Sequence, residues 1–148
     1  MVYSNLVDHA DLATRPALES DLEAIAALQA AAPEASQWSV RDYLGYDCLV
    51  ALRGVEVVGF AVSRSVAEGE WELLNLAVAP AARRLGVGRA LLTALTARRT
   101  GTVFLEVRAA NIGARRFYED FGFQLVTTRF EYYDNPSDSA IVMKFHSW

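Results

Sequence analysis

Three arginines and two glycines near the middle of the chain form a pattern that could bind phosphate groups. The stretch contains Arg83, Arg84, Gly86, Gly88 and Arg89. Glycines let a backbone adopt turns and approach a ligand in ways that a side chain would block. The N–H groups at the start of a following helix attract anions, and the arginines add full positive charge. We therefore predict a pyrophosphate site built mainly from backbone.

Two better-known phosphate-binding motifs do not fit this loop. A Walker loop ends in Gly-Lys followed by Ser or Thr, whereas this loop ends Gly88-Arg89-Ala90. A Rossmann fingerprint has a third glycine and lies near the start of a βαβ unit. Here the third position is Leu91, and several strands are expected before it. Neither of these two nucleotide sites is predicted.

Two other side chains could carry proton transfer, although each also has an ordinary structural explanation. Glu106 lies in an alternating strand pattern, where it could be solvated or paired with Arg108. Tyr118 belongs to an apolar stripe at helical spacing, which is typical of core packing. Its phenol has a reference pKa of about 10, so it would stay protonated at neutral pH. Spacing alone leaves both alternatives open.

The elements that must position these residues alternate between strands and helices in the middle of the chain. Hydrophobic periodicity predicts strands near residues 11–17, 48–53, 55–64, 72–78, 103–108, 124–133 and 140–145. It predicts helices near 20–33, after a Ser20-x-x-Glu23 capping box, from Ser39, and over 84–98 and 111–121. With hairpins at both ends, this order predicts an α/β protein with one mixed sheet and helices on both faces. We expect residues 1–10 to be a loose leader and 11–148 to be one domain.

Composition excludes several classes of protein. The net charge of −4 argues against a nucleic-acid-binding protein. The single cysteine, Cys48, allows no internal disulfide and is expected to be a buried strand thiol. His9 and His146 have no metal-ligand spacing, so no metal is expected. There is no long apolar run and no secretory signal, so we expect a cytoplasmic protein without a membrane partner.

The loop and the segments that follow it resemble the GNAT (Gcn5-related) N-acetyltransferase superfamily. Its signature, Gln/Arg-x-x-Gly-x-Gly/Ala, is matched by Arg83, Gly86 and Gly88. The Leu-Glu-Val-Arg-x-x-Asn pattern at 105–111 and the Tyr-Glu-x-x-Gly-Phe pattern at 118–123 resemble the RimI type, the ribosomal-protein alanine N-acetyltransferases. The resemblance covers nearly the whole chain.

The resemblance implies a fold and a co-substrate. The fold would be the GNAT acyl-CoA N-acyltransferase fold, in which a central mixed sheet of six to seven strands splays apart. The co-substrate would be acetyl-CoA, with its pantetheine arm along one strand, its diphosphate on the loop, and the N–H near Leu76 polarising the thioester. Asn111 could contact the co-substrate and also cap a helix. The cofactor-binding residues implied are Leu76, Ala77, Val78, Arg84, Leu85, Gly86, Val87, Gly88, Arg89 and Asn111.

The resemblance also implies roles for the two candidate proton-transfer residues. Glu106 would be the general base, acting directly or through a water, and Tyr118 the general acid. Glu72 is the alternative base, because many members of the superfamily place an acid on that strand.

The acceptor implied is the N-terminal α-amine of a protein, with alanine of a ribosomal protein as the first candidate. An α-amine has a pKa near ~7.7–8.0 and a lysine near ~10.4, so deprotonation costs roughly 3.5 kcal/mol less for the α-amine. The chain departs from the pattern at Ala79, where an acid is common, and at Asp138-Ser139, where Glu-Asp is usual. Another protein N-terminus, a lysine, a small amine, or a non-catalytic acyl-CoA sensor stay open as alternatives. The oligomeric state is not predicted.

Overall fold

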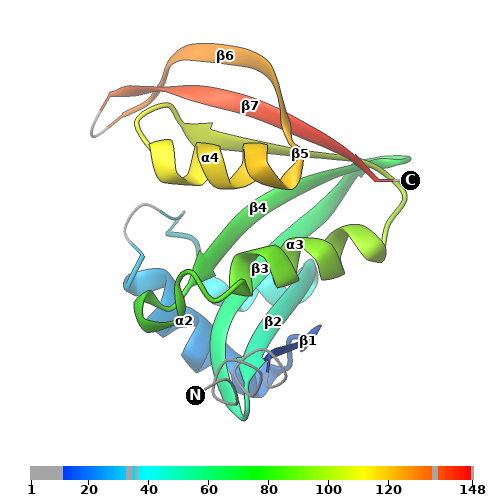
Figure 1. The fold of residues 1–148 in the computed structure, drawn as a ribbon, viewed down its shortest axis with the longest axis vertical. Helices are drawn as coiled ribbons and strands as arrows, with labels where there is room; N and C mark the ends of the chain where they lie inside the picture. Colours follow the sequence, from blue (N-terminus) through cyan, green and yellow to red (C-terminus); the bar gives the residue numbers. More distant parts are fainter. Residues whose placement is uncertain (1–11, 33–34, 36, 135–136, 148) are drawn as a thin grey trace, which may run out of the picture. The chain divides into compact units, whose positions relative to one another are not determined.

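The computed structural model describes residues 12–32, 35, 37–134 and 137–147, so the expected leader at 1–10 lies outside the described residues. Seven strands follow one another in the sheet order β1-β2-β3-β4-β5-β7-β6 (Figure 1). β4 and β5 are parallel and β5 and β7 antiparallel, so the predicted mixed α/β sheet is confirmed. The strands are β1 (Leu12–Pro16), β2 (Asp47–Arg53), β3 (Glu56–Ala67), β4 (Glu70–Val78), β5 (Gly101–Arg108), β6 (Gln124–Tyr133) and β7 (Asp138–Ser147).

In the part of the chain that the structure describes, three α-helices and three short 3₁₀ helices connect the strands. The α-helices are α2 (Leu22–Ala30), α3 (Val87–Ala97) and α4 (Ile112–Phe121). The 3₁₀ helices are η1 (Glu19–Asp21), η2 (Val40–Gly45) and η3 (Pro80–Ala82). Within the described residues, no helix is long and apolar enough to span a membrane.

The chain forms two compact units, which are described separately. The first comprises the described parts of residues 1–64 and 74–98, and the second those of 65–73 and 99–148.

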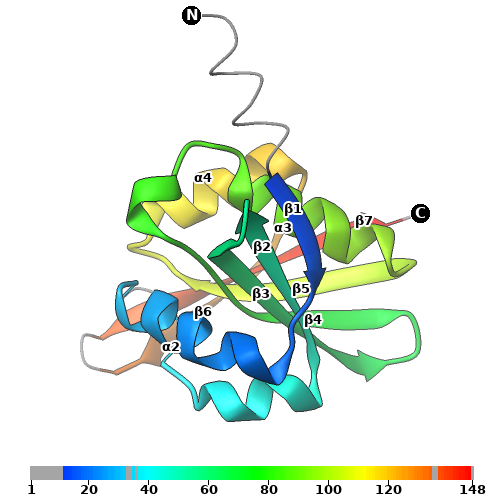
Figure 2. The same ribbon diagram turned by 90° about the horizontal axis from the view of Figure 1, so that it is seen from below.

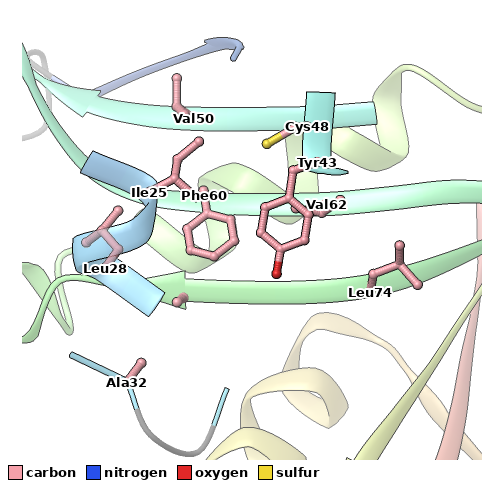
Figure 3. Packing of buried hydrophobic residues seen from close by; sticks show 10 residues of the cluster. Ile25, Leu28, Ala32, Tyr43, Cys48, Val50, Phe60, Val62 and Leu74 are labelled. Atoms are coloured by element: carbon pink, nitrogen blue, oxygen red, sulfur yellow. The ribbon is translucent and has the colours of Figure 1, made fainter. Parts of the chain in front are cut away.

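The first unit packs helices on both faces of its strands (Figure 2). On one face, Ile25 of α2 and Tyr43 of η2 join Phe60 of β3 in a buried cluster (Figure 3). On the other face, α3 approaches β3 so closely that a Cβ at Gly59 would lie 2.9 Å from Val87 Cγ1. Glycine at this position therefore allows the close packing of helix on strand.

The second unit has one face of its strands covered by aromatic side chains. Val103 and Leu105 of β5 are buried, and their register partners on β7 include Phe145. Phe145 in turn contacts Phe121 at the end of α4, with ring centroids 5.1 Å apart. Because side chains alternate along a strand, Glu106 points to the opposite face from Leu105.

One predicted detail is wrong: Ser20 and Glu23 do not begin α2 with a capping box. A 3₁₀ turn, η1, comes first, and Asp21 occupies the N-cap position of α2 without capping it. The Asp21 carboxylate instead accepts from the Leu18 N–H at 2.7 Å and pairs with Arg15 at 2.7 Å. The bond from Arg15 is the main cause of a lowered Asp21 pKa. These bonds hold the chain in the tighter turn and delay the start of the α-helix.

Candidate active site

The glycine loop that is predicted to bind phosphate lies in the first unit, directly before α3. Arg84 has φ 65° and Gly86 has φ 81°, both in the left-handed region, and Gly86 is the N-cap of α3. Among the described side chains none caps this helix end, and the N–H groups of its first turn point out of the helix. Arg83 and Arg89 are exposed beside it, as is Arg84. An anion here would meet backbone donors, the positive helix end and guanidinium charge together.

The structure moves the start of this helix from the predicted residue 84 to Val87. A right-handed helix cannot include the left-handed backbone of Arg84 and Gly86. Residues 84–86 therefore belong to the loop and 87–89 to the first turn of α3. The predicted diphosphate residues thus divide between a turn that bends the chain and a helix end that presents N–H groups.

The strand before the loop shows that one candidate donor already has a partner. The Leu76 N–H donates to Asn75 Oδ1 at 3.0 Å. A thioester carbonyl would have to share this N–H or replace Asn75 there. The assignment of Leu76, Ala77 and Val78 to the pantetheine arm stays a prediction.

Asn75 belongs to a buried amide network in the first unit that was not predicted from the sequence. Gln29 Oε1 accepts from the Tyr43 hydroxyl at 2.5 Å and from Asn75 Nδ2 at 3.1 Å. Gln29 Nε2 donates to the Trp38 carbonyl at 2.6 Å. Burial raises the pKa of Tyr43, which keeps its hydroxyl a donor. The sequence feature that could have indicated this network is a single amide within an apolar run, Leu74-Asn75-Leu76. An amide that is buried in such a run needs hydrogen-bond partners.

In the second unit, Glu106 is partly exposed and forms an ion pair across the sheet. Its side chain is 25% exposed, and Oε1 lies 3.1 Å from Arg129 Nη1. Arg129 lies on β6 and was not predicted, because an arginine on an alternating strand reads as ordinary surface. A carboxylate in this position can accept a proton from an amine that reaches the same face.

Tyr118 is buried, as the helical stripe predicted. It is 9% exposed, and its ring lies 5.2 Å from Phe117 and 5.4 Å from Phe123. Burial raises its pKa, so the hydroxyl keeps its proton well above neutral pH. The α4 aromatics cover the face opposite Glu106, so the two groups approach β5 from different sides.

The alternative base, Glu72, lies on the same face as Glu106. Register pairs Glu72 of β4 with Phe104 of β5, and Phe104 alternates in phase with Glu106. The geometry of this unit therefore keeps both carboxylates as candidates. Asn111 accepts from the Ala114 N–H at 3.1 Å and so caps α4, which confirms the structural half of its predicted role.

Comparison with known proteins gives consistent results. The profile of the Acetyltransferase (GNAT) family matches residues 15–123. The [ribosomal protein bS18]-alanine N-acetyltransferase of Salmonella typhimurium is 35% identical over 117 residues, which cover 72% of this chain and 78% of that protein. The enzyme of the same name from Haemophilus ducreyi is 37% identical over 97 residues, or 61% of this chain and 66% of that protein. In this and other such matches the chain spans slightly less than two thirds of the relative's length.

A solved structure extends the likeness along the chain. The crystal structure of the ribosomal-protein-S18-alanine N-acetyltransferase from Escherichia coli has a TM-score of 0.78 and 29% sequence identity. The superposition covers 92% of this chain and 94% of that one.

Proposed function

Because the chain belongs to the acetyltransferase (GNAT) family, we propose that it transfers the acetyl group of acetyl-CoA to the N-terminal α-amine of a protein. The observation that carries this choice of acceptor is the 35% identity over 72% of the chain to an enzyme that acts on the N-terminal alanine of ribosomal protein bS18. A ribosomal protein that begins with alanine is therefore the first acceptor to test.

The glycine loop is the proposed site of the coenzyme's diphosphate. Its left-handed turn at Gly86 and the exposed Arg84 and Arg89 suit an anion with several oxygens. Leu76, Ala77 and Val78 are proposed to bind the pantetheine arm through backbone groups. Asn111, which caps α4, is proposed to contribute a contact as well.

The reaction would be a direct attack of the amine nitrogen on the thioester carbonyl carbon. The C–N bond forms and the C–S bond breaks. The ammonium nitrogen loses one proton before the attack and a second as the amide forms, the departing thiolate gains one, and one proton is released to solvent. Glu106 is proposed to accept the first of these protons, because its side chain is partly exposed. Tyr118 is proposed to supply the proton to sulfur, because the family resemblance places the general acid at this tyrosine; burial raises its pKa, so the hydroxyl carries its proton at neutral pH. Deprotonation at neutral pH costs roughly 3.5 kcal/mol less for an α-amine than for a lysine. A carboxylate base therefore suits an α-amine acceptor better than a lysine acceptor.

The test is acetyl-CoA incubated with a panel of acceptors, read by intact mass. The panel holds a peptide that begins with alanine, the same peptide with a blocked N-terminus and an internal lysine, and a small polyamine. We expect acetylation of the free α-amine only. Transfer to the blocked peptide or the polyamine would move the proposal to those acceptors, and binding of acetyl-CoA without any transfer would favour an acyl-CoA sensor.

A further inference from the structure

Five side chains of the second unit form a connected set on the face of Glu106, which we name the arginine–tyrosine ring. Glu106 pairs with Arg129 at 3.1 Å, and the Arg129 guanidinium lies 5.5 Å from the ring centre of Tyr132. Tyr132 contacts Tyr133 with centroids 5.2 Å apart. Arg108, two residues from Glu106 on β5, lies 4.2 Å over the Tyr133 ring. The set therefore begins and ends on the strand that carries the proposed base.

The register explains why an arginine is needed to reach Glu106. Arg108 on β5 and Arg129 on β6 are both partners of Ala140 on the intervening strand β7. Neighbouring strands lie about 4.8 Å apart, so Arg129 must cross roughly 10 Å to reach β5. Ala140 is small and fully buried, so a long side chain can lie over it. Few side chains besides arginine combine this reach with a positive charge.

A bulge in β6 places the members of the set on one face. Arg129 of β6 pairs with Ala140 of β7, and Tyr133 pairs with Asp138. Between these two pairs, β6 therefore has two more residues than β7. Within the bulge Glu131 has φ 52°, a left-handed backbone that side chains rarely adopt. In a regular strand, residues 129 and 132 would point to opposite faces. The bulge shifts this phase, so that Arg129 and Tyr132 meet. Bulges beside active sites commonly re-aim side chains in this way.

We propose that Arg129 is a positioning residue for Glu106: it holds the carboxylate in place until the cationic amine of the acceptor arrives and takes over as its partner. This inference rests on the proposed role of Glu106 as the base. The acceptor amine can replace Arg129 as the partner of Glu106 at little cost, because the Arg129 side chain is 54% exposed and exposed ion pairs contribute little to stability. The other charged side chains on this face include Arg108, which is stacked on Tyr133, and Asp138, together with Lys144 of β7 and Glu72 of β4. Both Asp138 oxygens accept backbone N–H groups, from Ala110 and Ser139.

A double-mutant cycle on the full chain tests this assignment. The variants are Arg129→Met, Arg129→Lys, Glu106→Gln and the double variant Glu106→Gln/Arg129→Met. We expect Arg129→Met to lower kcat roughly tenfold to a hundredfold, as misplacement of a reacting group does, and to leave KM for acetyl-CoA within about twofold. Lysine keeps the charge but loses the planar fork, so Arg129→Lys should recover part of the loss.

The decisive result is the behaviour of the double variant. If Arg129 acts through Glu106, removing it from the Glu106→Gln protein should change kcat by less than about twofold. An equal loss in both backgrounds, or no loss in Arg129→Met alone, would overturn the proposal. Lys144→Met is the matched control, because it removes an exposed cation from β7 on the face of Glu106. It should leave kcat unchanged.

The same measurements separate this inference from the proposed function. If the unmodified protein acetylates α-amines and Glu106→Gln is slow while Arg129→Met is not, the proposed function stands and the role of Arg129 is wrong. If the unmodified protein acetylates no α-amine, the proposed function fails and the inference falls with it. Urea unfolding of Arg129→Met should show a loss of stability below about 1 kcal/mol; a larger loss together with equal kcat effects in both backgrounds would assign Arg129 a structural role.

Discussion

The two units each contain a polar network, and the two networks differ in burial and in charge. In the first unit, Gln29, Tyr43 and Asn75 are neutral and at most 6% exposed. In the second, the ion pair of Glu106 and Arg129 has side chains that are 25% and 54% exposed. A buried donor or acceptor that loses its partner has no water to replace it. The first network should therefore hold the fold, whereas the second can change partners at little cost.

The difference also separates two ways in which this chain could handle a substrate. The first unit offers backbone groups, at the left-handed turn before α3, and a rigid core fixes their positions. The second unit offers ionisable side chains on one face of its strands. Binding through backbone tolerates side-chain variation, whereas proton transfer does not. Measurements on Glu106, Gln29, Glu131 and Cys48 test this division between the two units.

Glu106→Gln should give the largest effect on turnover. The amide keeps the size of the side chain and a hydrogen bond to Arg129 but cannot accept the amine proton, so kcat should fall roughly 10²- to 10³-fold. Affinity for acetyl-CoA, measured by calorimetry, should be nearly unchanged. If turnover is comparable to that of the unmodified protein, the base is Glu72 or water, and Glu72→Gln then distinguishes the two.

Gln29→Leu should give the largest effect on stability. It removes the acceptor of the Tyr43 hydroxyl and the Asn75 amide together, so the free energy of unfolding should fall by about 2–4 kcal/mol in urea titrations. The exposed Gln37, which also bonds to backbone carbonyls, provides the control. Gln37→Leu should cost about 1 kcal/mol. A smaller loss for Gln29→Leu than for Gln37→Leu would contradict a structural role for the buried network.

Glu131→Gly should stabilise the second unit slightly. The backbone at this position has φ 52°, which glycine adopts without strain, although glycine also loses more entropy on folding. We expect a net gain of about 0.5 kcal/mol in thermal or urea unfolding, with kcat unchanged because the bulge is kept. A clear loss of stability would show that the Glu131 side chain makes a contact worth more than the strain.

Cys48 should react with thiol reagents very slowly in the folded protein. Burial in β2 raises its pKa to about 12, so its thiolate fraction at pH 8 is on the order of 10⁻⁴. Labelling should be about a thousandfold slower than in urea. The unfolded thiol ionises near pH ~8.5, so this residue's contribution to stability is present below that pH and is lost as pH rises toward 12. Rapid labelling under native conditions would show that the core of the first unit opens.

Most of the elements were predictable because their signals are local. Apolar alternation located β5 and β7, and the apolar stripe before Gly122 located α4. The errors fall where one side chain or one backbone angle overrides a pattern. The Asp21 carboxylate accepts from the Leu18 N–H and so stabilises the 3₁₀ turn η1 before α2. The left-handed backbone of Arg84 places the start of α3 three residues later than predicted. The extension of β3 to Ala67 was also missed, because exposed residues at a strand end carry no periodic signal.

Residue types along the chain are enough to specify the family and the mixed α/β sheet, and they predict the diphosphate loop and the two residues proposed for proton transfer. Each of these depends on residue types at fixed spacing along the chain. Three features appear only in the folded chain: the ion pair of Arg129 with Glu106, the hydrogen bond from Asn75 to Gln29, and the two-residue bulge in β6. These contacts join residues far apart in sequence, and they depend on strand register, which local spacing does not specify.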